Sequence, residues 1–162
     1  MMNNFNEYLS LKNNCLFMEG VDVTEIAKEF STPLFVFSEN HIRNNLKRFK
    51  KCFEDHWPHG EVRILPSLKA CPLIAVRKIL TDEGCGCDVF GPGELECALN
   101  AGVEPSEISV NGSIKDRALI KRTIEVGARL VIDSLQELQI CNEESNNLKK
   151  SIDILLRIKP FR

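Results

Sequence analysis

ILPSLKACP, at residues 64–72, is the stretch that decides how this chain is expected to fold. Apolar residues lead up to Lys69, and Pro72 then opens a segment whose apolar residues recur at helical spacing. A strand that ends in a lysine and turns into a helix is one βα unit, with the amine at the carboxyl end of the strand. An amine held there can form a Schiff base with a carbonyl compound. Most such lysines are simply solvated, so the case for Lys69 depends on the segments that follow it.

The composition is that of a globular protein large enough to bury a core. Of its 162 residues, 43% are hydrophobic and 27% are charged, which excludes a disordered chain. The formal net charge of −2 provides no basic field to attract nucleic acid or an anionic membrane. No apolar run approaches the roughly 20 residues of a membrane span, and the first residues lack a secretory signal pattern. We therefore expect a cytoplasmic protein that binds neither nucleic acid nor membrane.

The cysteines indicate free thiols and not a disulfide framework or a metal site. There are seven, an odd number at scattered spacings, as is typical of a reducing compartment. Cys85 and Cys87 form one close pair, but a structural zinc site usually needs a second pair, and the sequence has none. We predict no metal site.

The first 30 residues are interpreted as a lead-in to a main domain over residues 31–162. Within the lead-in, apolar residues at helical spacing predict a helix over residues 21–30, with Thr24 as its N-cap. The apolar run PLFVF at residues 33–37 is typical of a short strand. A helix is expected next, from about residue 39 to residue 53 and capped by Ser38.

From residue 61 the chain alternates between strand-like and helix-like segments with short joints. Strands are expected at residues 62–68, 87–90, 108–111, 129–132 and 152–158, and helices at residues 73–80, 94–101, 116–126 and 135–142. Gly102 and Gly127 stand where helices commonly end, and Ser134 can cap the last helix. Alternation of this kind predicts an α/β fold with parallel strands.

Two parallel architectures suit this alternation. A doubly wound sheet typically binds a nucleotide at a glycine-rich first turn, but the turn after Lys69 has no glycine, and residues 91–93 lack the third glycine of the fingerprint. A (β/α)8 TIM barrel instead gathers polar residues from several strand ends on one face. Such residues lie at or just after successive predicted strands: Lys69, Asp88, Asn111, Asp133 and Arg157. We therefore predict the rim of a reaction site on a barrel.

The predicted barrel is incomplete. A full barrel needs eight strands and about 250 residues, whereas the pattern here accounts for the first five or so βα units. We interpret the chain as the N-terminal portion of a longer protein, and a self-sufficient five-stranded protein is the alternative. Because open sheet edges and uncovered apolar surface favour association, we expect these residues alone to self-associate or to be poorly soluble.

Several segments, in consistent order, resemble one family. The residues that carry the resemblance are PSLKACP at 66–72, which is similar to the family's Tyr-Ala-Val-Lys-Ala-Asn-Pro, GCGCDV at 84–89, GEL at 93–95, AGVEP at 101–105, VIDS at 131–134 and LRI at 156–158. From residue 33 to residue 158 the chain resembles the N-terminal barrel half of the fold-type III pyridoxal-phosphate-dependent decarboxylases. These are the ornithine, diaminopimelate and arginine decarboxylase group, with alanine racemase as a more distant relative.

The resemblance implies an alanine racemase-like barrel in which Lys69 carries pyridoxal 5'-phosphate as a Schiff base. It further implies that Asp88 is catalytic and lies near that bond, and that Arg157 lies beside the cofactor. The implied activity is decarboxylation of a small amino acid, by an enzyme that is a homodimer in its full-length form. The chain departs from the family pattern at Pro66, Cys71 and Gly91, where the family has tyrosine, asparagine and frequently serine. These departures leave the choice of substrate open.

Two other functions remain open at this point. The first is a racemase-type pyridoxal-phosphate enzyme on the same barrel, which a second catalytic residue, normally far downstream, would distinguish from a decarboxylase. The second is a non-catalytic homologue or fragment that binds a decarboxylase chain.

Overall fold

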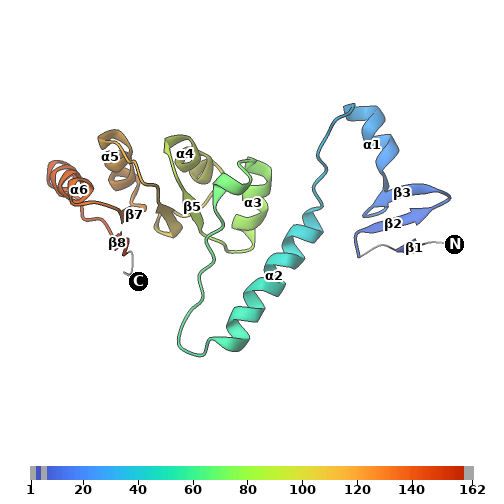
Figure 1. The fold of residues 1–162 in the computed structure, drawn as a ribbon, viewed down its shortest axis with the longest axis horizontal. Helices are drawn as coiled ribbons and strands as arrows, with labels where there is room; N and C mark the ends of the chain where they lie inside the picture. Colours follow the sequence, from blue (N-terminus) through green and yellow to red (C-terminus); the bar gives the residue numbers. More distant parts are fainter. Residues whose placement is uncertain (1–2, 5–6, 159–162) are drawn as a thin grey trace. The chain divides into compact units, whose positions relative to one another are not determined.

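The structure, a computed structural model, describes residues 3–4 and 7–158 of the chain. It divides into two compact units, Met1–Phe49 and Lys50–Arg162, which Figure 1 colours from blue to red along the chain. The division falls inside a helix and not at a flexible linker, and the boundary predicted between residues 30 and 31 stays a prediction.

The first unit begins with an antiparallel sheet of four short strands. These are β1 (Asn3–Asn4), β2 (Leu9–Lys12), β3 (Cys15–Met18) and β4 (Val21–Asp22). Asn13 and Asn14 join β2 to β3 with φ values of 51° and 62°, the conformation of a two-residue hairpin turn whose twist matches its strands. The sequence pattern predicts no strands here. Strands this short leave too little alternation of polar and apolar residues to be detected.

Helix α1 (Val23–Phe30) confirms the helix expected in this region, but its cap is a different residue. Asp22 precedes the helix, and its Oδ1 accepts a hydrogen bond from the Thr24 backbone N at 2.8 Å. The prediction that Thr24 is the N-cap was therefore wrong, because Thr24 lies in the first turn and donates to the cap. The hydrogen bonds that Thr24 donates lower the pKa of Asp22 below the ordinary value, because they stabilise the carboxylate.

Residues 33–37 do not form the predicted strand. They are irregular and have no sheet partner in the described part of the chain, and the side chain of Phe35 is 94% exposed. A strand is stable only when neighbours satisfy its backbone and cover its apolar face. Apolar composition alone is therefore not enough to predict a strand at residues 33–37.

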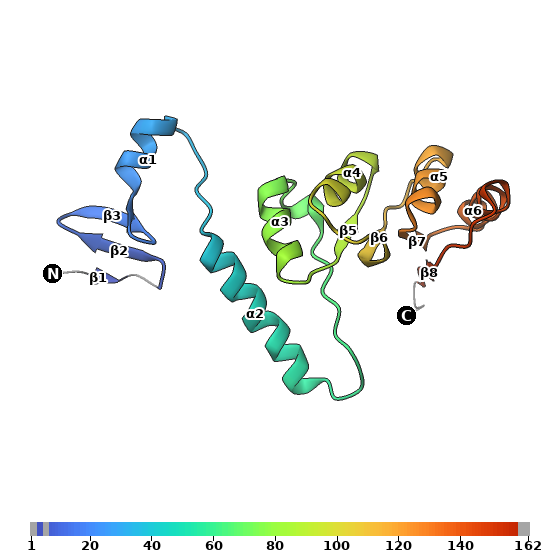
Figure 2. The ribbon, with the colours of Figure 1, turned by 180° about the vertical axis from the view of Figure 1, so that it is seen from behind.

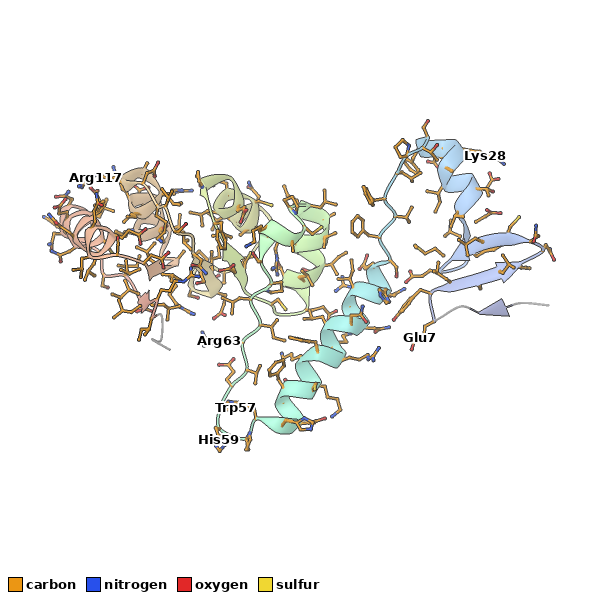
Figure 3. The ribbon with its side chains drawn as sticks, in the orientation of Figure 1. Glu7, Lys28, Trp57, His59, Arg63 and Arg117 are labelled. Carbon is orange, nitrogen blue, oxygen red and sulfur yellow. The ribbon has the colours of Figure 1, made fainter. Side chains whose placement is uncertain are left out.

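Helix α2 (Glu39–His56) begins where the sequence predicts and ends three residues later than expected. Ser38 caps it as predicted, since Ser38 Oγ accepts a hydrogen bond from the His41 backbone N at 2.9 Å. Trp57 and His59 follow the helix, with their rings edge to face and 5.1 Å apart between centroids (Figure 3). Both side chains are exposed, so this segment is a surface turn.

The second unit is an α/β structure with a four-stranded parallel sheet in the order β5-β6-β7-β8. Its elements are the short 3-10 helix η1 (Leu68–Ala70), α3 (Ile74–Asp82), β5 (Cys87–Val89), α4 (Pro92–Asn100), η2 (Pro105–Glu107), β6 (Ile108–Val110), α5 (Arg117–Val126), β7 (Arg129–Ile132), α6 (Leu135–Leu148) and β8 (Ile154–Leu156). Figures 1 and 2 show α4, α5 and α6 on the same side of the strands. The predicted α/β class with parallel strands is confirmed. Strands in chain order, covered by helices on one side, differ from a doubly wound sheet, where the order reverses.

The first predicted strand of this unit, over residues 62–68, is absent. Only Ser67 pairs with the sheet, as an isolated parallel bridge to Asp88, and the Pro66 carbonyl accepts a hydrogen bond from Asp88 N at 3.3 Å. Proline has no N–H to donate to a ladder, which confines it to strand ends and edges. Pro66 therefore explains why pairing is limited to one bridge.

The other predicted elements of this unit are present with shifted ends. The last strand is shorter than expected, and α6 runs six residues beyond the predicted end at residue 142. No glycine or proline follows residue 142 to stop the helix, which continues until Lys149 takes a left-handed conformation at φ 52°. Gly127 ends α5 as predicted, with a left-handed φ of 81°.

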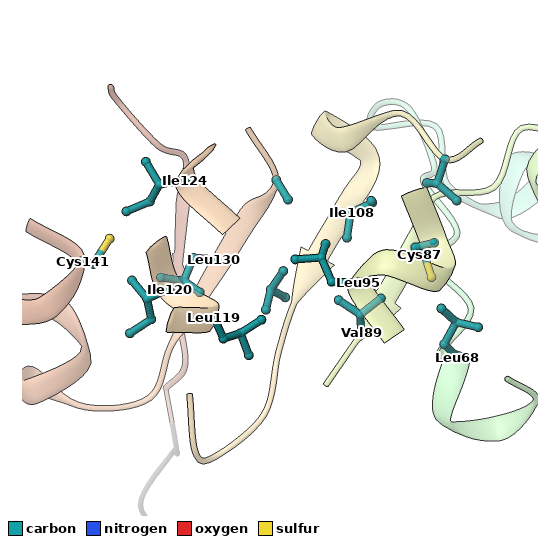
Figure 4. Close-up of a cluster of buried hydrophobic side chains, with 14 of the residues drawn as sticks. Leu68, Cys87, Val89, Leu95, Ile108, Leu119, Ile120, Ile124, Leu130 and Cys141 are labelled. Carbon is teal, nitrogen blue, oxygen red and sulfur yellow. The ribbon is translucent and has the colours of Figure 1, made fainter. Parts of the chain in front are cut away.

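The hydrophobic core of the second unit lies between the parallel strands and their covering helices (Figure 4). Its fully buried members include strand and helix residues alike: Cys87, Val89, Leu95, Ile108, Val110, Ile120 and Leu130. In the first unit, Leu46 is the one buried side chain among the residues whose burial is described. Among the residues placed by the structure, no helix has both the length and the apolar character that crossing a bilayer requires.

Candidate active site

The carboxyl ends of the four parallel strands meet at one edge of the second unit's sheet. Asp88 lies in β5, and Asn111, Asp133 and Arg157 directly follow β6, β7 and β8. Lys69 joins the same edge, because Ser67 runs parallel to β5 at its bridge with Asp88 and Lys69 comes two residues later. The structure thus places all five of the residues predicted for the rim at this edge. The contacts that they make differ from one to the next.

Lys69 is exposed and its amine lies over an aromatic ring. The Nζ atom is 4.2 Å from the centroid of the Phe90 ring, within the range of a cation–π interaction. Within the described residues, no carboxylate lies within ion-pair distance of this nitrogen. Because the Lys69 side chain is exposed and no acidic side chain of the described part binds its amine, the amine is accessible to an electrophile such as an aldehyde.

Phe90, which the sequence analysis did not single out, is held in place from two sides. Its backbone N donates to Glu94 Oε2 at 2.9 Å, which fixes the residue at the start of α4. Gly112 lies against it, with a φ of 115°, and a Cβ at position 112 would come within 3.2 Å of the Phe90 carbonyl oxygen. A side chain at position 112 would therefore displace Phe90, and with it the ring under Lys69.

Asp88 is half-buried in β5 and close to Lys69 along the sheet edge. Its backbone pairs with Ser67, yet no hydrogen bond or ion pair joins its carboxylate to Lys69 or Arg157 in the described structure. The structure therefore places Asp88 next to the Lys69 turn but does not bring the three predicted site side chains into mutual contact.

Asn111 has a local role at the end of β6. Its backbone N donates to the Val89 carbonyl at 2.7 Å, and its Oδ1 accepts from Gly112 N at 2.8 Å. The side-chain oxygen thus satisfies the backbone N–H of the next residue, where the chain leaves the strand. Asn111 thus shapes the loop after β6.

Arg157 pairs with Asp133, which follows the neighbouring strand. Arg157 Nε lies 3.7 Å from Asp133 Oδ1, too long for a hydrogen bond but within ion-pair range. The pairing follows from register: Ile132 in β7 is opposite Leu156 in β8, so the residues that follow them are neighbours. Asp133 Oδ1 is buried and has no hydrogen-bond partner among the described residues.

Lys115 and Glu137 form a buried ion pair that the sequence analysis did not predict. Lys115 Nζ is 3.0 Å from Glu137 Oε2, and the two side chains are 0% and 8% exposed. The same Glu137 oxygen accepts a hydrogen bond from Asp133 N at 2.9 Å. The available signal was the spacing of Ser134 and Glu137 at the start of α6, which is typical of a capping box whose glutamate turns back toward the preceding residues.

The buried cysteines are core residues. Burial raises the pKa of the Cys85, Cys87 and Cys141 thiols above the ordinary value, although the nearby Arg77 guanidinium lowers it at Cys85 and Cys87. These thiols are therefore neutral at neutral pH and pack as small apolar groups. Within the described ranges, no three His, Cys, Asp or Glu side chains are grouped so as to bind a metal ion.

Comparison with known proteins identifies the family. A family model described as "Pyridoxal-dependent decarboxylase, pyridoxal binding domain" matches residues 39–161. The chain belongs to this family. It is 33% identical over 151 residues to the diaminopimelate decarboxylase of Archaeoglobus fulgidus and 31% identical over 161 residues to that of Aquifex aeolicus, which covers 93% and 99% of this chain. The chain spans about a third of the length of these relatives, 35% and 37%.

Solved structures agree with this assignment. The chain superposes on diaminopimelate decarboxylase from Methanocaldococcus jannaschii with a TM-score of 0.90 and 32% sequence identity, over 96% of this chain and 36% of that one. A second structure of that enzyme, in complex with L-lysine, gives a TM-score of 0.88 at 30% identity, over 93% of this chain and 36% of that one. The family resemblance inferred from the sequence is therefore confirmed.

The residues at the sheet edge fit pyridoxal phosphate, the cofactor that the family implies. The Lys69 amine can bond to the cofactor aldehyde, and the Phe90 ring provides an aromatic surface beside it. Ser67 Oγ, two residues before Lys69, is buried without a hydrogen-bond partner among the described residues, as is Asp133 Oδ1. Buried polar atoms are normally satisfied, so the Ser67 hydroxyl suits a polar ligand, whereas Asp133 Oδ1 already lies 3.7 Å from Arg157 Nε.

Proposed function

We propose that this chain forms the pyridoxal-phosphate-binding portion of a diaminopimelate decarboxylase, with Lys69 as the lysine that bonds to the cofactor. The observation that carries the proposal is the Lys69 amine, which is exposed at the carboxyl edge of a parallel sheet and unpaired among the described carboxylates. The named relatives support the substrate. They are diaminopimelate decarboxylases, and one solved neighbour holds L-lysine, the amino acid left when diaminopimelate loses one carboxyl group as carbon dioxide.

In this mechanism Lys69 would hold the cofactor, because its Nζ is a primary amine that can bond to an aldehyde. When bound, pyridoxal phosphate supplies an electron sink for the electron pair left by decarboxylation. Once the substrate is bound, the Lys69 amine would be the group that delivers a proton. Asp88 is half-buried and lies next to the Lys69 turn. Its carboxylate would influence the protonation of the Lys69 nitrogen through charge and hydrogen bonding. Arg157 is exposed at the end of β8. Its guanidinium group would bind the cofactor ring or a neighbouring carboxylate.

We also propose that the parallel sheet is part of an eight-stranded alanine racemase-like barrel, of which this chain provides about the first five βα units. Two features support this. The strands follow one another in chain order, and their helices cover one side, as barrel closure requires. The homodimer implied by the resemblance and the cytoplasmic location expected from the sequence stay predictions.

The proposal is tested in the intact protein with pyridoxal phosphate and meso-diaminopimelate. We expect a visible absorption band from the cofactor bound to protein, together with release of carbon dioxide. The Lys69→Ala variant should lose both, because no amine remains at that position. Lys121→Ala, at an exposed lysine of α5, is the matched control and should keep both.

The alternatives give different results in the same experiment. A racemase-type enzyme would exchange the α-proton of its amino acid without releasing carbon dioxide. A non-catalytic homologue would do neither. Full activity of Lys69→Ala would contradict the role of Lys69, and preference for ornithine over diaminopimelate would contradict the substrate.

A further inference from the structure

We infer that Lys115 is a positioning residue for the candidate site. Through Gly112 it holds the loop beside Phe90 and Lys69, and through Glu137 it holds the pair of Asp133 and Arg157. This inference rests on the proposed role of Lys69 and goes beyond it, since Lys115 contacts neither Lys69 nor Arg157. It concerns the loop between β6 and α5, residues 111–116, in which Lys115 is the one buried side chain of a charged residue.

Among the described residues, Lys115 makes two polar contacts, one in its own loop and one across to helix α6. Its Nζ donates to the Gly112 carbonyl oxygen and forms the 3.0 Å ion pair with Glu137 Oε2. The side chain is 0% exposed, so these contacts replace the water that would otherwise solvate the ammonium group. Lys115 thereby ties the loop after β6 to the first turn of α6.

The first branch leads from Lys115 to Lys69. By binding the Gly112 carbonyl, Lys115 fixes the residue whose missing side chain leaves room for Phe90. A Cβ at position 112 would lie 3.5 Å from Phe90 Cδ1 and 3.2 Å from Phe90 O, so the Gly112 backbone lies close against Phe90, and we expect a shift of this loop to move the ring. The Phe90 ring in turn carries the Lys69 amine at 4.2 Å.

The second branch leads from Lys115 to Arg157. Glu137 Oε2, which Lys115 neutralises, accepts the hydrogen bond from Asp133 N at 2.9 Å. This bond sets the backbone from which the Asp133 carboxylate reaches Arg157 Nε at 3.7 Å. Lys115 therefore connects the contact between Lys69 and Phe90 with the ion pair between Asp133 and Arg157.

Burying the charges of Lys115 and Glu137 contributes little net stability. Removing two charges from water usually cancels most of their attraction, and apolar residues of similar volume are often as stabilising. An apolar side chain, however, could not bind the Gly112 carbonyl and the Glu137 carboxylate at once. The pair therefore fixes the geometry of this edge.

The inference is tested with Lys115→Met, Glu137→Gln and the double variant, in the intact protein. The first measurement is the rate at which Lys69 is labelled by pyridoxal phosphate and borohydride, read by mass spectrometry of the Lys69 peptide. The second is hydrogen exchange at the amides of Gly112 and Asp133. The third is the position of the visible absorption band of the labelled state before reduction, which reports the surroundings of Lys69.

We expect each single variant to slow labelling of Lys69 by about tenfold, a factor that corresponds to about 1.4 kcal/mol, and to shift the absorption band. Both amides should exchange faster. The double variant should be no worse than Lys115→Met, because Lys115→Met already removes both contacts of Lys115. Arg117→Met is the matched control, since Arg117 bridges α5 to Glu143 and Glu144 of α6 outside this loop (Figure 3 labels it). It should leave labelling, exchange and absorption unchanged.

The contrary results are distinct from a failure of the proposed function. If folded Lys115→Met labels Lys69 at the rate of the unmodified protein, with normal exchange at Gly112 and Asp133, then Lys115 has no positioning role. Where Lys115→Met does not fold, Glu137→Gln decides the question, because it keeps the side-chain volume and removes the charge. If the unmodified protein itself gives no Lys69 label, the proposed function fails, while exchange at the two amides still tests the inference.

Discussion

Lys69 and Lys115 belong to the same sheet edge, yet their surroundings are opposite. Lys69 is exposed, lies over a neutral ring and has no carboxylate partner among the described residues. Lys115 is fully buried and bound to both Glu137 and the Gly112 carbonyl. The difference separates an amine that can react from an amine that can only hold its neighbours. The surroundings of Lys69 are called the Lys69 region below, and residues 111–116 with Glu137 the Lys115 region.

The largest expected difference between the regions is in stability. Lys115→Met leaves the Glu137 carboxylate buried without its partner, which should lower the free energy of unfolding by about 3–5 kcal/mol. Lys69→Met removes an exposed side chain and should change it by no more than about 0.5 kcal/mol. Denaturant unfolding of both variants measures the two values. Equal losses would remove the distinction between the lysines.

The next effect tests the contact that joins the two regions. Gly112→Ala places a Cβ against Phe90 at a φ of 115°, a conformation that residues with side chains rarely adopt. We expect a loss of about 1–3 kcal/mol in the free energy of unfolding, together with slower labelling of Lys69. Gly93→Ala, in the first turn of α4 with no atom within 4 Å of the new Cβ, is the matched control and should be neutral or slightly stabilising. A harmless Gly112→Ala would show that Phe90 is not fixed by this loop.

A smaller effect is expected at the helix start that supports Glu137. Ser134 Oγ accepts a hydrogen bond from Glu137 N at 3.2 Å, and Ser134→Ala removes it. Loss of an N-cap typically costs about 1 kcal/mol, which thermal or denaturant unfolding can measure. Ser113→Ala, at an exposed loop position, should have almost no effect. If the two variants behave alike, the cap does not stabilise the Lys115 region.

The smallest effect concerns the buried thiols of Cys85, which precedes β5, and Cys87, its first residue. Burial raises the pKa of Cys85 and Cys87 in the folded protein, so the folded state keeps the proton that the unfolded state releases. Their contribution to stability is therefore complete below the unfolded thiol pKa, about 8.5, and is lost as the pH rises through the folded value. Unfolding measured from pH 7 to pH 10 should show this decline, and Cys87→Ala should reduce it. The exposed Cys52→Ala should leave the decline unchanged; a Cys87→Ala curve parallel to that of the unmodified protein would contradict the assignment.

The sequence predicted the Lys69 region because its signals are local. An apolar run, a lysine and a helix start lie within residues 64–74, and regular alternation predicted the strands and helices that follow. The Lys115 region depends on contacts between segments far apart in the chain. A lysine in a polar loop is usually solvated, and its burial becomes evident only when α6 places Glu137 beside it. The same holds for Arg157, whose neighbour Asp133 follows from the register of β7 and β8.

The errors elsewhere have related physical causes. Residues 62–68 and 33–37 have the composition of strands, but pairing decides whether a strand forms, and Pro66 removes one of the donors that pairing needs. The antiparallel sheet of residues 3–22 was missed for the opposite reason. Its strands are two to four residues long, and turns with left-handed asparagines determine the hairpin more than any apolar pattern does.

The reactive amine can be identified by one chemical experiment. The intact protein is mixed with pyridoxal phosphate, reduced with borohydride so that the carbon–nitrogen bond becomes permanent, digested, and mapped by mass spectrometry. We predict that the label is found on the peptide that contains Lys69, with Lys115 unmodified. A label confined to other lysines, with residue 69 unmodified in a folded protein, would contradict the account.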